Sequence, residues 1–246
     1  MAAASCTRMD VVEGWSVIED AELESRREAV AELGAAMRSL SEAVVRAEAD
    51  IPELRAAAAA ARSLADRLWL TARGLRQVPS VDDLAGGTRF FSLGTGIGHP
   101  VSPPLRLAEE PDGTLVGQAT LGARLEGPPG MLHGGMIALL FDEMLGWAAA
   151  RAHAHGMTAQ LEVTYRRAVP LDAEIVIVAR TTSTEGRKVW TEATLARADD
   201  PGTLLATARA LFVRPREELS REYFSGLVDA AGRPAPGADS WQAPTA

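Results

Sequence analysis

Two neighbouring acids, Asp142 and Glu143, interrupt an otherwise apolar stretch of the chain. Large apolar side chains occupy nearly every other position there: Met136, Ile137, Leu139, Leu140, Phe141, Met144, Leu145 and Trp147. A segment that is apolar all round and too short to span a membrane is typical of a buried core helix. Burying a carboxylate is costly unless it is paired or hydrogen-bonded, so an acid here indicates a chemical role. We assign that role to Asp142 and expect Glu143 to face solvent.

The tripeptide His133-Gly134-Gly135 opens the same predicted helix. Two glycines at a helix start let another group approach the free backbone N–H groups, which carry partial positive charge. Such donors can form an oxyanion hole, which stabilises the oxygen that becomes negative during acyl transfer. Alone, the tripeptide is better explained by a tight turn. In combination with Asp142 it predicts acyl-transfer chemistry.

The spacing between the two features predicts how they combine. Asp142 lies nine residues beyond His133, which is ~13 Å along one helix axis at about 1.5 Å per residue. A carboxylate and an oxyanion hole that serve one carbonyl must both lie within a few ångströms of it. One helix therefore cannot supply both. Two antiparallel helices related by a two-fold axis can, so the sequence predicts a dimer with two composite sites.

The elements around this helix are predicted to be strands. From residue 105 onward the pattern reads as one strand, the helix and then four strands, at residues 114–125, 134–152, 159–167, 174–182, 188–198 and 204–213. Short turn-forming connections between the later strands favour an antiparallel sheet. Because this helix is the one element available to cover a sheet face, the sheet must curl around it. The expected fold class is α+β.

Residues 20–73 read as two helices with heptad-like apolar spacing. Asp50 can cap the second helix, and Pro52 falls in its first turn, where a missing N–H does no harm. We expect an antiparallel helical hairpin or part of a coiled coil, which leans either on its own domain or on another subunit. The predicted organisation is a helical extension over residues 1–85, a catalytic domain over 86–215 and a partly mobile tail over 216–246. Phe90 and Phe91 predict that the glycine-rich segment after the hairpin packs on an apolar surface.

Composition excludes several classes of protein. The formal net charge of −8 disfavours a nucleic-acid partner. A lone cysteine, Cys6, rules out an internal disulfide framework, and no apolar run reaches the ~18–20 residues of a membrane helix. Without a visible secretory signal, the expected location is cytoplasmic. His153 and His155 lack further ligands nearby, so no metal site is expected. No Gly-x-Ser-x-Gly nucleophile motif of an α/β-hydrolase occurs.

The segment 133–142, with His-Gly-Gly followed after six residues by Asp142, resembles the signature of the hotdog-fold thioesterase superfamily. The phenylacetate-pathway-type and THEM4-like acyl-CoA thioesterases are the most similar branches. Three further landmarks of that family follow in order: Thr158-Ala159-Gln160-Leu161, Thr164-Tyr165-Arg166-Arg167 and Gly186-Arg187-Lys188-Val189. The resemblance covers about residues 105–215 and implies a hotdog fold, in which a curved antiparallel sheet wraps a long central helix.

The resemblance also implies catalytic roles. Asp142 acts at the thioester carbonyl, either as general base on water or as nucleophile. The Gly134 N–H of the partner subunit polarises the carbonyl oxygen, and His133 shapes that loop. Thr158 positions the water or the carboxylate. The implied reaction is hydrolysis of an acyl-CoA, or of an acyl-carrier thioester, to the free acid.

Substrate contacts follow from the same resemblance. Arg187 and Lys188 are expected to bind CoA phosphates, and Thr164 is expected to contact substrate, although the family more often has Asn there. Ala168 likewise replaces a common Pro. CoA is part of the substrate, so no separate cofactor is expected. The expected assembly is a homodimer or a dimer of dimers, and the length of the acyl chain is left open.

The sequence is compatible with three alternative functions. The chain could be a hydratase or dehydratase on the same fold, although the landmarks favour hydrolysis. It could be an acyl-CoA-binding sensor or accessory protein that does not turn over. Finally, the N-terminal hairpin could be an interaction module, with the remaining domain serving dimerisation. An intact Asp142 favours an enzyme, because a binder gains nothing from a buried carboxylate facing a thioester.

Overall fold

The computed structural model describes residues 20–83, 88–103, 105–152, 156–229 and 233. The elements, in chain order, are α1 (Asp20–Arg46), α2 (Ile51–Trp69), β1 (Arg106–Glu109), β2 (Leu115–Thr120), the short 3-10 helix η1 (Ala123–Leu125), α3 (Gly134–Arg151), β3 (Met157–Tyr165), β4 (Glu174–Glu185), β5 (Lys188–Arg197), β6 (Asp200–Val213) and α4 (Glu217–Phe224). Cys6, His153 and His155 lie outside the described residues, as does most of the predicted tail. Within the described residues, no helix is long and apolar enough to cross a membrane.

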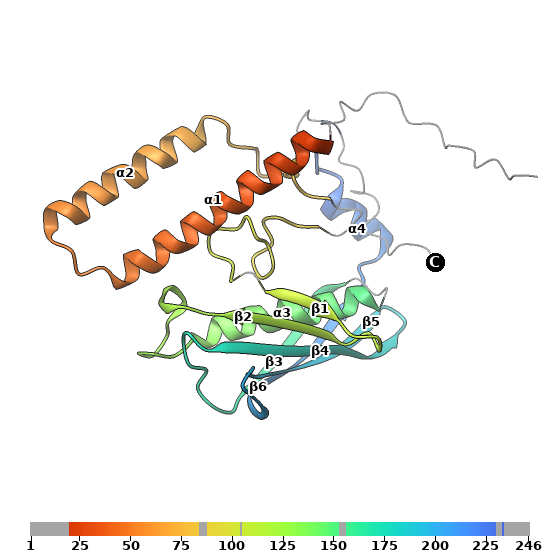
Figure 1. Ribbon diagram of the computed structural model, residues 1–246. Helices are drawn as coiled ribbons and strands as arrows, with labels where there is room; N and C mark the ends of the chain where they lie inside the picture. Colours follow the sequence, from red (N-terminus) through yellow and green to blue (C-terminus); the bar gives the residue numbers. More distant parts are fainter. Residues whose placement is uncertain (1–19, 84–87, 104, 153–155, 230–232, 234–246) are drawn as a thin grey trace, which may run out of the picture.

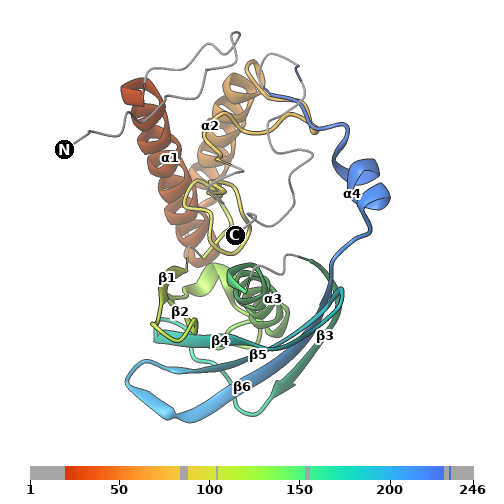
Figure 2. The same ribbon diagram turned by 90° about the vertical axis from the view of Figure 1, so that its right-hand side faces the viewer.

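All six strands form one antiparallel sheet in the order β1-β2-β4-β5-β6-β3. The sheet curves around α3 (Figures 1 and 2). On α3, Leu140, Phe141, Met144 and Leu145 are completely buried, as the all-round apolar sequence predicts. Inward-facing residues of the strands, such as Ile175, complete this core. The predicted α+β fold with a helix wrapped by an antiparallel sheet, the hotdog arrangement, is confirmed.

Strand β3 lies at one end of the strand order, so β6 is its partner within the described chain. Leu161 and Val163 of β3 pack toward α3, whereas its other seven residues are exposed. A nine-residue edge strand with a free row of N–H and C=O groups is available to pair with another chain. Figure 2 shows this edge at the side of the sheet opposite β1 and β2.

The predicted N-terminal helices are present. Asp50 caps α2 by accepting from the Glu53 N–H at 2.9 Å, and Pro52 stands in the first turn. The apolar faces of α1 and α2 do not pack tightly against each other, however. No residue of α2 is buried, and Leu54 and Leu68 are each 47% exposed. Helix α1 instead packs against the glycine-rich segment 88–103, which lies between α1 and α3 (Figure 2).

Two elements differ from the sequence-based expectation. Strand β1 was not predicted, and it pairs with β2 across the turn at Gly113, the turn that the Pro111-Asp112-Gly113 sequence indicates. The predicted strand over residues 114–125 ends at Thr120 and is followed by η1. Glu143 also departs from expectation, because it faces segment 88–103 and is not turned to solvent. Phe90 in that segment is buried, as expected, and Phe91 is 37% exposed.

Candidate active site

Asp142 lies on the side of α3 that faces the start of β3. Its Oδ1 atom accepts a hydrogen bond from the Thr158 hydroxyl at 2.8 Å. Among the described residues, Thr158 is the one group that donates to this carboxylate. Asp142 is half-buried. The sequence placed these two residues sixteen positions apart, and the structure brings them together.

The start of α3 lies at the other end of this side of the molecule. His133 is the N-cap residue, and its Nδ1 atom accepts from the Gly135 N–H at 3.0 Å. Within the described part of the chain, no group accepts from the Gly134 N–H. The Gly134 carbonyl accepts from the Tyr165 hydroxyl at 2.8 Å. The Gly134 N–H is therefore a free donor at the positive end of a long helix, where an anionic oxygen is stabilised.

Asp142 and Gly134 occupy one straight helix, eight residues apart, which corresponds to ~12 Å at about 1.5 Å rise per residue. A single carbonyl group cannot contact both in one chain. Strand β3 connects the two places, because Thr158 near its beginning binds Asp142 and Tyr165 at its end binds the Gly134 carbonyl. Both halves of the predicted site thus lie along the free edge of the sheet.

The two predicted CoA-binding cations lie at the β4–β5 turn. Lys188 is paired with Val213 on β6, which is paired in turn with Met157 on β3. This row brings Lys188 to the Thr158 end of β3, about 10 Å away across two strand spacings. Lys188 is exposed, whereas the Arg187 guanidinium donates to the Arg214 carbonyl at 2.8 Å. The exposed ammonium is the freer of the two for an anionic ligand.

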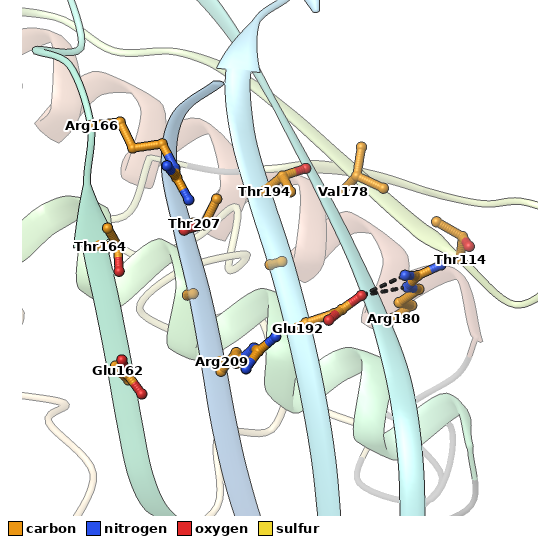
Figure 3. Close-up of a pocket in the computed structure, with 12 residues that line it drawn as sticks. Thr114, Glu162, Thr164, Arg166, Val178, Arg180, Glu192, Thr194, Thr207 and Arg209 are labelled. Atoms are coloured by element: carbon orange, nitrogen blue, oxygen red, sulfur yellow. Dashed lines mark hydrogen bonds and ion pairs between the residues drawn. The ribbon is translucent and has the colours of Figure 1, made fainter. Parts of the chain in front are cut away.

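Thr164 lies apart from this group. It is paired with Thr207, on the face of the sheet turned away from α3. With Arg180, Glu192 and Arg209 it lines a hollow of about 540 Å³ on that outer face (Figure 3). Arg180 and Glu192 hold each other there with two hydrogen bonds of 2.8 and 2.5 Å. The hollow does not include Asp142 or Gly134, so the structure separates Thr164 from the other predicted site residues of its own chain.

Two residues beside the site were not assigned a role from the sequence. Tyr165 was visible only as part of a family landmark, and its contact with the Gly134 carbonyl depends on how β3 crosses α3. Glu143 accepts from Ser92, Thr95 and Trp147. Within the described residues, no group of three or more His, Cys, Asp or Glu side chains is arranged to hold a metal ion.

Comparison with known proteins identifies the family of this chain. The family model described as Thioesterase superfamily matches residues 129–203, which include both halves of the site. A crystal structure of a thioesterase superfamily protein superposes with a TM-score of 0.66 and 32% identity, covering 75% of this chain and 94% of that protein. The chain therefore belongs to the thioesterase superfamily.

Curated relatives include the acyl-coenzyme A thioesterase THEM4 of Xenopus laevis, 40% identical over 93 residues, which are 38% of this chain and 41% of that protein. THEM4 of Mus musculus is 37% identical over 93 residues, covering 38% of this chain and 40% of its own length. The chain thus spans about two fifths of the curated relatives that it matches.

Proposed function

We propose that this protein is an acyl-CoA thioesterase that hydrolyses an acyl-CoA to a free acid and CoA. The observation that carries the proposal is the half-buried carboxylate of Asp142, held by Thr158 at the edge of the sheet. A binding protein would gain nothing from such a group facing a thioester. The names of the curated relatives support the same substrate class.

Asp142 acts on water in the proposed reaction. Its free oxygen accepts a proton as the water oxygen attacks the carbonyl carbon, and the carbonyl oxygen becomes negative. The Gly134 N–H donates to that oxygen. Collapse of the tetrahedral intermediate breaks the carbon–sulfur bond, and the departing thiolate takes the proton from Asp142. Direct attack by the carboxylate, through a mixed anhydride that water then hydrolyses, would use the same geometry.

We further propose that the active unit is a homodimer formed along β3. Antiparallel pairing of two β3 strands about a two-fold axis can place the Thr158 end of each strand beside the Tyr165 end of its partner. Asp142 of one subunit would then lie near Gly134 of the other. The free edge of β3 and the ~12 Å between these residues within one helix support this assembly.

The activity is tested by thiol release from a panel of short, aromatic and long-chain acyl-CoAs, with wild-type protein and Asp142→Ala side by side. Turnover that falls by about 100-fold or more in the variant supports the carboxylate as the acting group. Binding of acyl-CoA without turnover in the wild type would overturn the enzyme reading in favour of a sensor. The preferred acyl group identifies the substrate class.

The composite site is tested by mixing two inactive variants. Gly134→Pro removes the proposed oxyanion donor while keeping a residue that suits the first helical position, and the extended backbone of His133 tolerates a following proline. A heterodimer of Asp142→Ala with Gly134→Pro has one intact site if each site uses both chains. Activity recovered on mixing supports the shared site. No recovery, with heterodimer formation shown by mass, means that each chain carries a complete site.

A further inference from the structure

Glu143, the residue after Asp142, has a set of partners that the proposed reaction does not use. Its Oε1 atom accepts from the Ser92 hydroxyl, from the Thr95 hydroxyl at 3.0 Å and from the Trp147 indole N–H at 3.4 Å. A half-buried carboxylate with three donors on one oxygen is a specific anchor, because desolvation without such partners would be costly. Glu143 thus fastens α3 to the segment 88–103, which we call the strap.

The strap is fixed on its other side by α1. The Arg38 guanidinium donates from Nη1 to the carbonyl groups of Ile97 and His99, both at 2.8 Å. Gly34 on α1 touches the strap backbone so closely that an added Cβ atom would lie 2.7 Å from the Gly98 carbonyl carbon. The strap therefore lies between two helices and has polar contacts to both (Figure 2).

The strap also meets Glu143 through its backbone. A Cβ atom added at Gly94 would lie 2.4 Å from the Cγ atom of Glu143, so the chain passes directly over this side chain. Ser92 and Thr95 flank that glycine and supply the two hydroxyl donors. Gly94 therefore leaves room for the Glu143 side chain, and the nearby Ser92 and Thr95 bind its carboxylate.

Adjacent residues on a helix point about 100° apart. A rotation of α3 about its axis would therefore move both Asp142 and Glu143, which lie on different sides of the helix. Asp142 meets β3, and Glu143 meets the strap. The sheet side of α3 is held mainly by apolar packing, with hydrogen bonds from Thr181 to the Ala148 carbonyl and from Tyr165 to the Gly134 carbonyl. A rotation of about 10° would move a carboxylate by ~1 Å, and a displacement of that size can cost up to 10²-fold in rate.

We propose that Glu143 is a positioning residue: by binding Ser92 and Thr95 of the α1-anchored strap, it fixes the rotational setting of α3 that holds Asp142 against Thr158. This inference rests on the proposed function for its kinetic consequence, but the positioning itself is a property of the fold. It makes α1 and the strap, which lie outside the matched family segment, part of the catalytic apparatus.

The kinetic test compares variants that remove the anchor with one that retains it. Glu143→Ala and the double variant Ser92→Ala/Thr95→Ala each delete the contact. Glu143→Gln keeps an amide oxygen where all three donors converge. The expected result is a roughly 10-fold or greater loss of kcat in the first two, with KM changed less than about twofold, and near wild-type kcat in Glu143→Gln. Glu109→Gln, which loosens the exposed pair with Arg151 at the far end of α3, is the matched control and should retain kcat.

A second readout does not require turnover. In full-length protein labelled with ¹³C at aspartate, the Asp142 carboxyl resonance is assigned by its loss in Asp142→Asn. It should shift in Glu143→Ala and in the double variant, and keep its position in Glu143→Gln and Glu109→Gln. A wild-type protein without thioesterase activity but with these shifts would refute the proposed function and leave the positioning role standing. An unmoved resonance with unchanged kcat would overturn the positioning role, even if the variants melt at lower temperature.

Discussion

The hydroxyl of Thr158, the second residue of the edge strand β3, donates to the carboxylate of Asp142 in the middle of α3 at 2.8 Å. This bond determines which carboxylate oxygen is left for chemistry. Oδ1 accepts from Thr158, whereas Oδ2 accepts from no group among the described residues. The hydrogen bond also ties the candidate base to the strand that we propose as the dimer interface.

Replacing Thr158 by Val removes the hydroxyl while nearly preserving the shape of the side chain. We expect kcat to fall by about 10-fold, because the carboxylate loses its one donor and samples other rotamers. KM for acyl-CoA should change little. Steady-state kinetics on the preferred substrate provide the measurement. Thr158→Ser keeps the hydroxyl and should retain most of the rate; a wild-type rate in Thr158→Val together with a loss in Thr158→Ser would mean that the methyl group, and not the hydrogen bond, matters.

Tyr165 gives a second prediction at the other half of the site. Its hydroxyl donates to the Gly134 carbonyl at 2.8 Å, and its ring lies 3.6 Å from the position of a Cβ atom added at Gly134. Tyr165→Phe keeps the ring and deletes the hydrogen bond. We expect kcat to fall roughly three- to tenfold, in line with about 1 kcal/mol for one hydrogen bond, because the oxyanion donor loses part of its support. An unchanged kcat would show that ring packing alone orients Gly134.

We expect the β4–β5 turn to bind the phosphates of CoA. Lys188 is exposed at the Thr158 end of the sheet, so Lys188→Ala should raise KM for acyl-CoA by about three- to tenfold, consistent with the loss of one charge-assisted contact. The effect should shrink at high salt, since exposed charges are screened. It should also vanish on an acyl-pantetheine substrate, which lacks the nucleotide phosphates.

Arg180→Ala is the matched control for Lys188, because Arg180 is an exposed cation on β4 that pairs with Glu192 on the outer face. Its KM for acyl-CoA should equal that of the wild type. A KM increase in Lys188→Ala that persists on acyl-pantetheine would show that the lysine does not read the phosphates. Arg187→Ala should additionally lower the melting temperature, since it loses the bond to the Arg214 carbonyl.

The sequence alone predicted the parts of this fold that depend on local pattern. The apolar helix around Asp142 and the four strands after it follow from periodicity, and the structure has them. Strand β1 could not be found in this way, because all four of its residues are exposed and it is held by pairing with β2. Helix α4 was likewise not predicted, and it falls in the segment 216–246 that the sequence indicates as a partly mobile tail. Its eight residues, Glu217–Phe224, are too few for a clear period.

The environment of Glu143 could not be predicted from the sequence. Asp142 and Glu143 are adjacent acids, and nothing in their local sequence says which one meets solvent. The answer depends on a segment some fifty residues earlier, whose Ser92 and Thr95 donate to Glu143 and whose other side contacts α1. Contacts at such separations are set by tertiary packing. The three-residue grouping Ser92, Gly94 and Thr95 was visible as a loop, but its partner was not.

Gly34 offers a test of the contact between α1 and the strap. Alanine usually stabilises a helix interior by about 1 kcal/mol relative to glycine. At Gly34 the added methyl would lie 2.7 Å from backbone atoms of Ile97 and Gly98, which cannot yield without moving the strap. Gly34→Ala should therefore lower the melting temperature by several degrees. Gly146→Ala is the matched control in α3, because its Cβ would meet Phe212 at an ordinary 3.7 Å, and it should melt at or above the wild-type temperature.

The contact of Glu42 with η1 should make the packing of α1 on the domain depend on pH. Its carboxylate accepts from the Arg124 and Ala123 N–H groups at 3.0 and 2.9 Å. These bonds, led by that from Arg124, hold the pKa of Glu42 below its ordinary value of 4.5, against the opposing effect of burial. A pKa that is lower in the folded protein than in the unfolded chain stabilises the fold above the ordinary value. That contribution disappears as the pH falls through the lowered pKa.

Glu42→Gln removes the titrating charge but keeps the shape and one acceptor. At neutral pH the variant should unfold at a lower temperature than wild type, by an amount that reflects roughly 1 kcal/mol, the difference between a hydrogen bond to a charged group and one to a neutral group. Below the lowered pKa of Glu42, both proteins present a neutral side chain to η1, so their melting temperatures should converge. Thermal unfolding of both proteins, followed by circular dichroism from about pH 3 to about pH 7, measures the difference. A gap that stays constant across this range would show that the charge of Glu42 does not hold α1 on the domain.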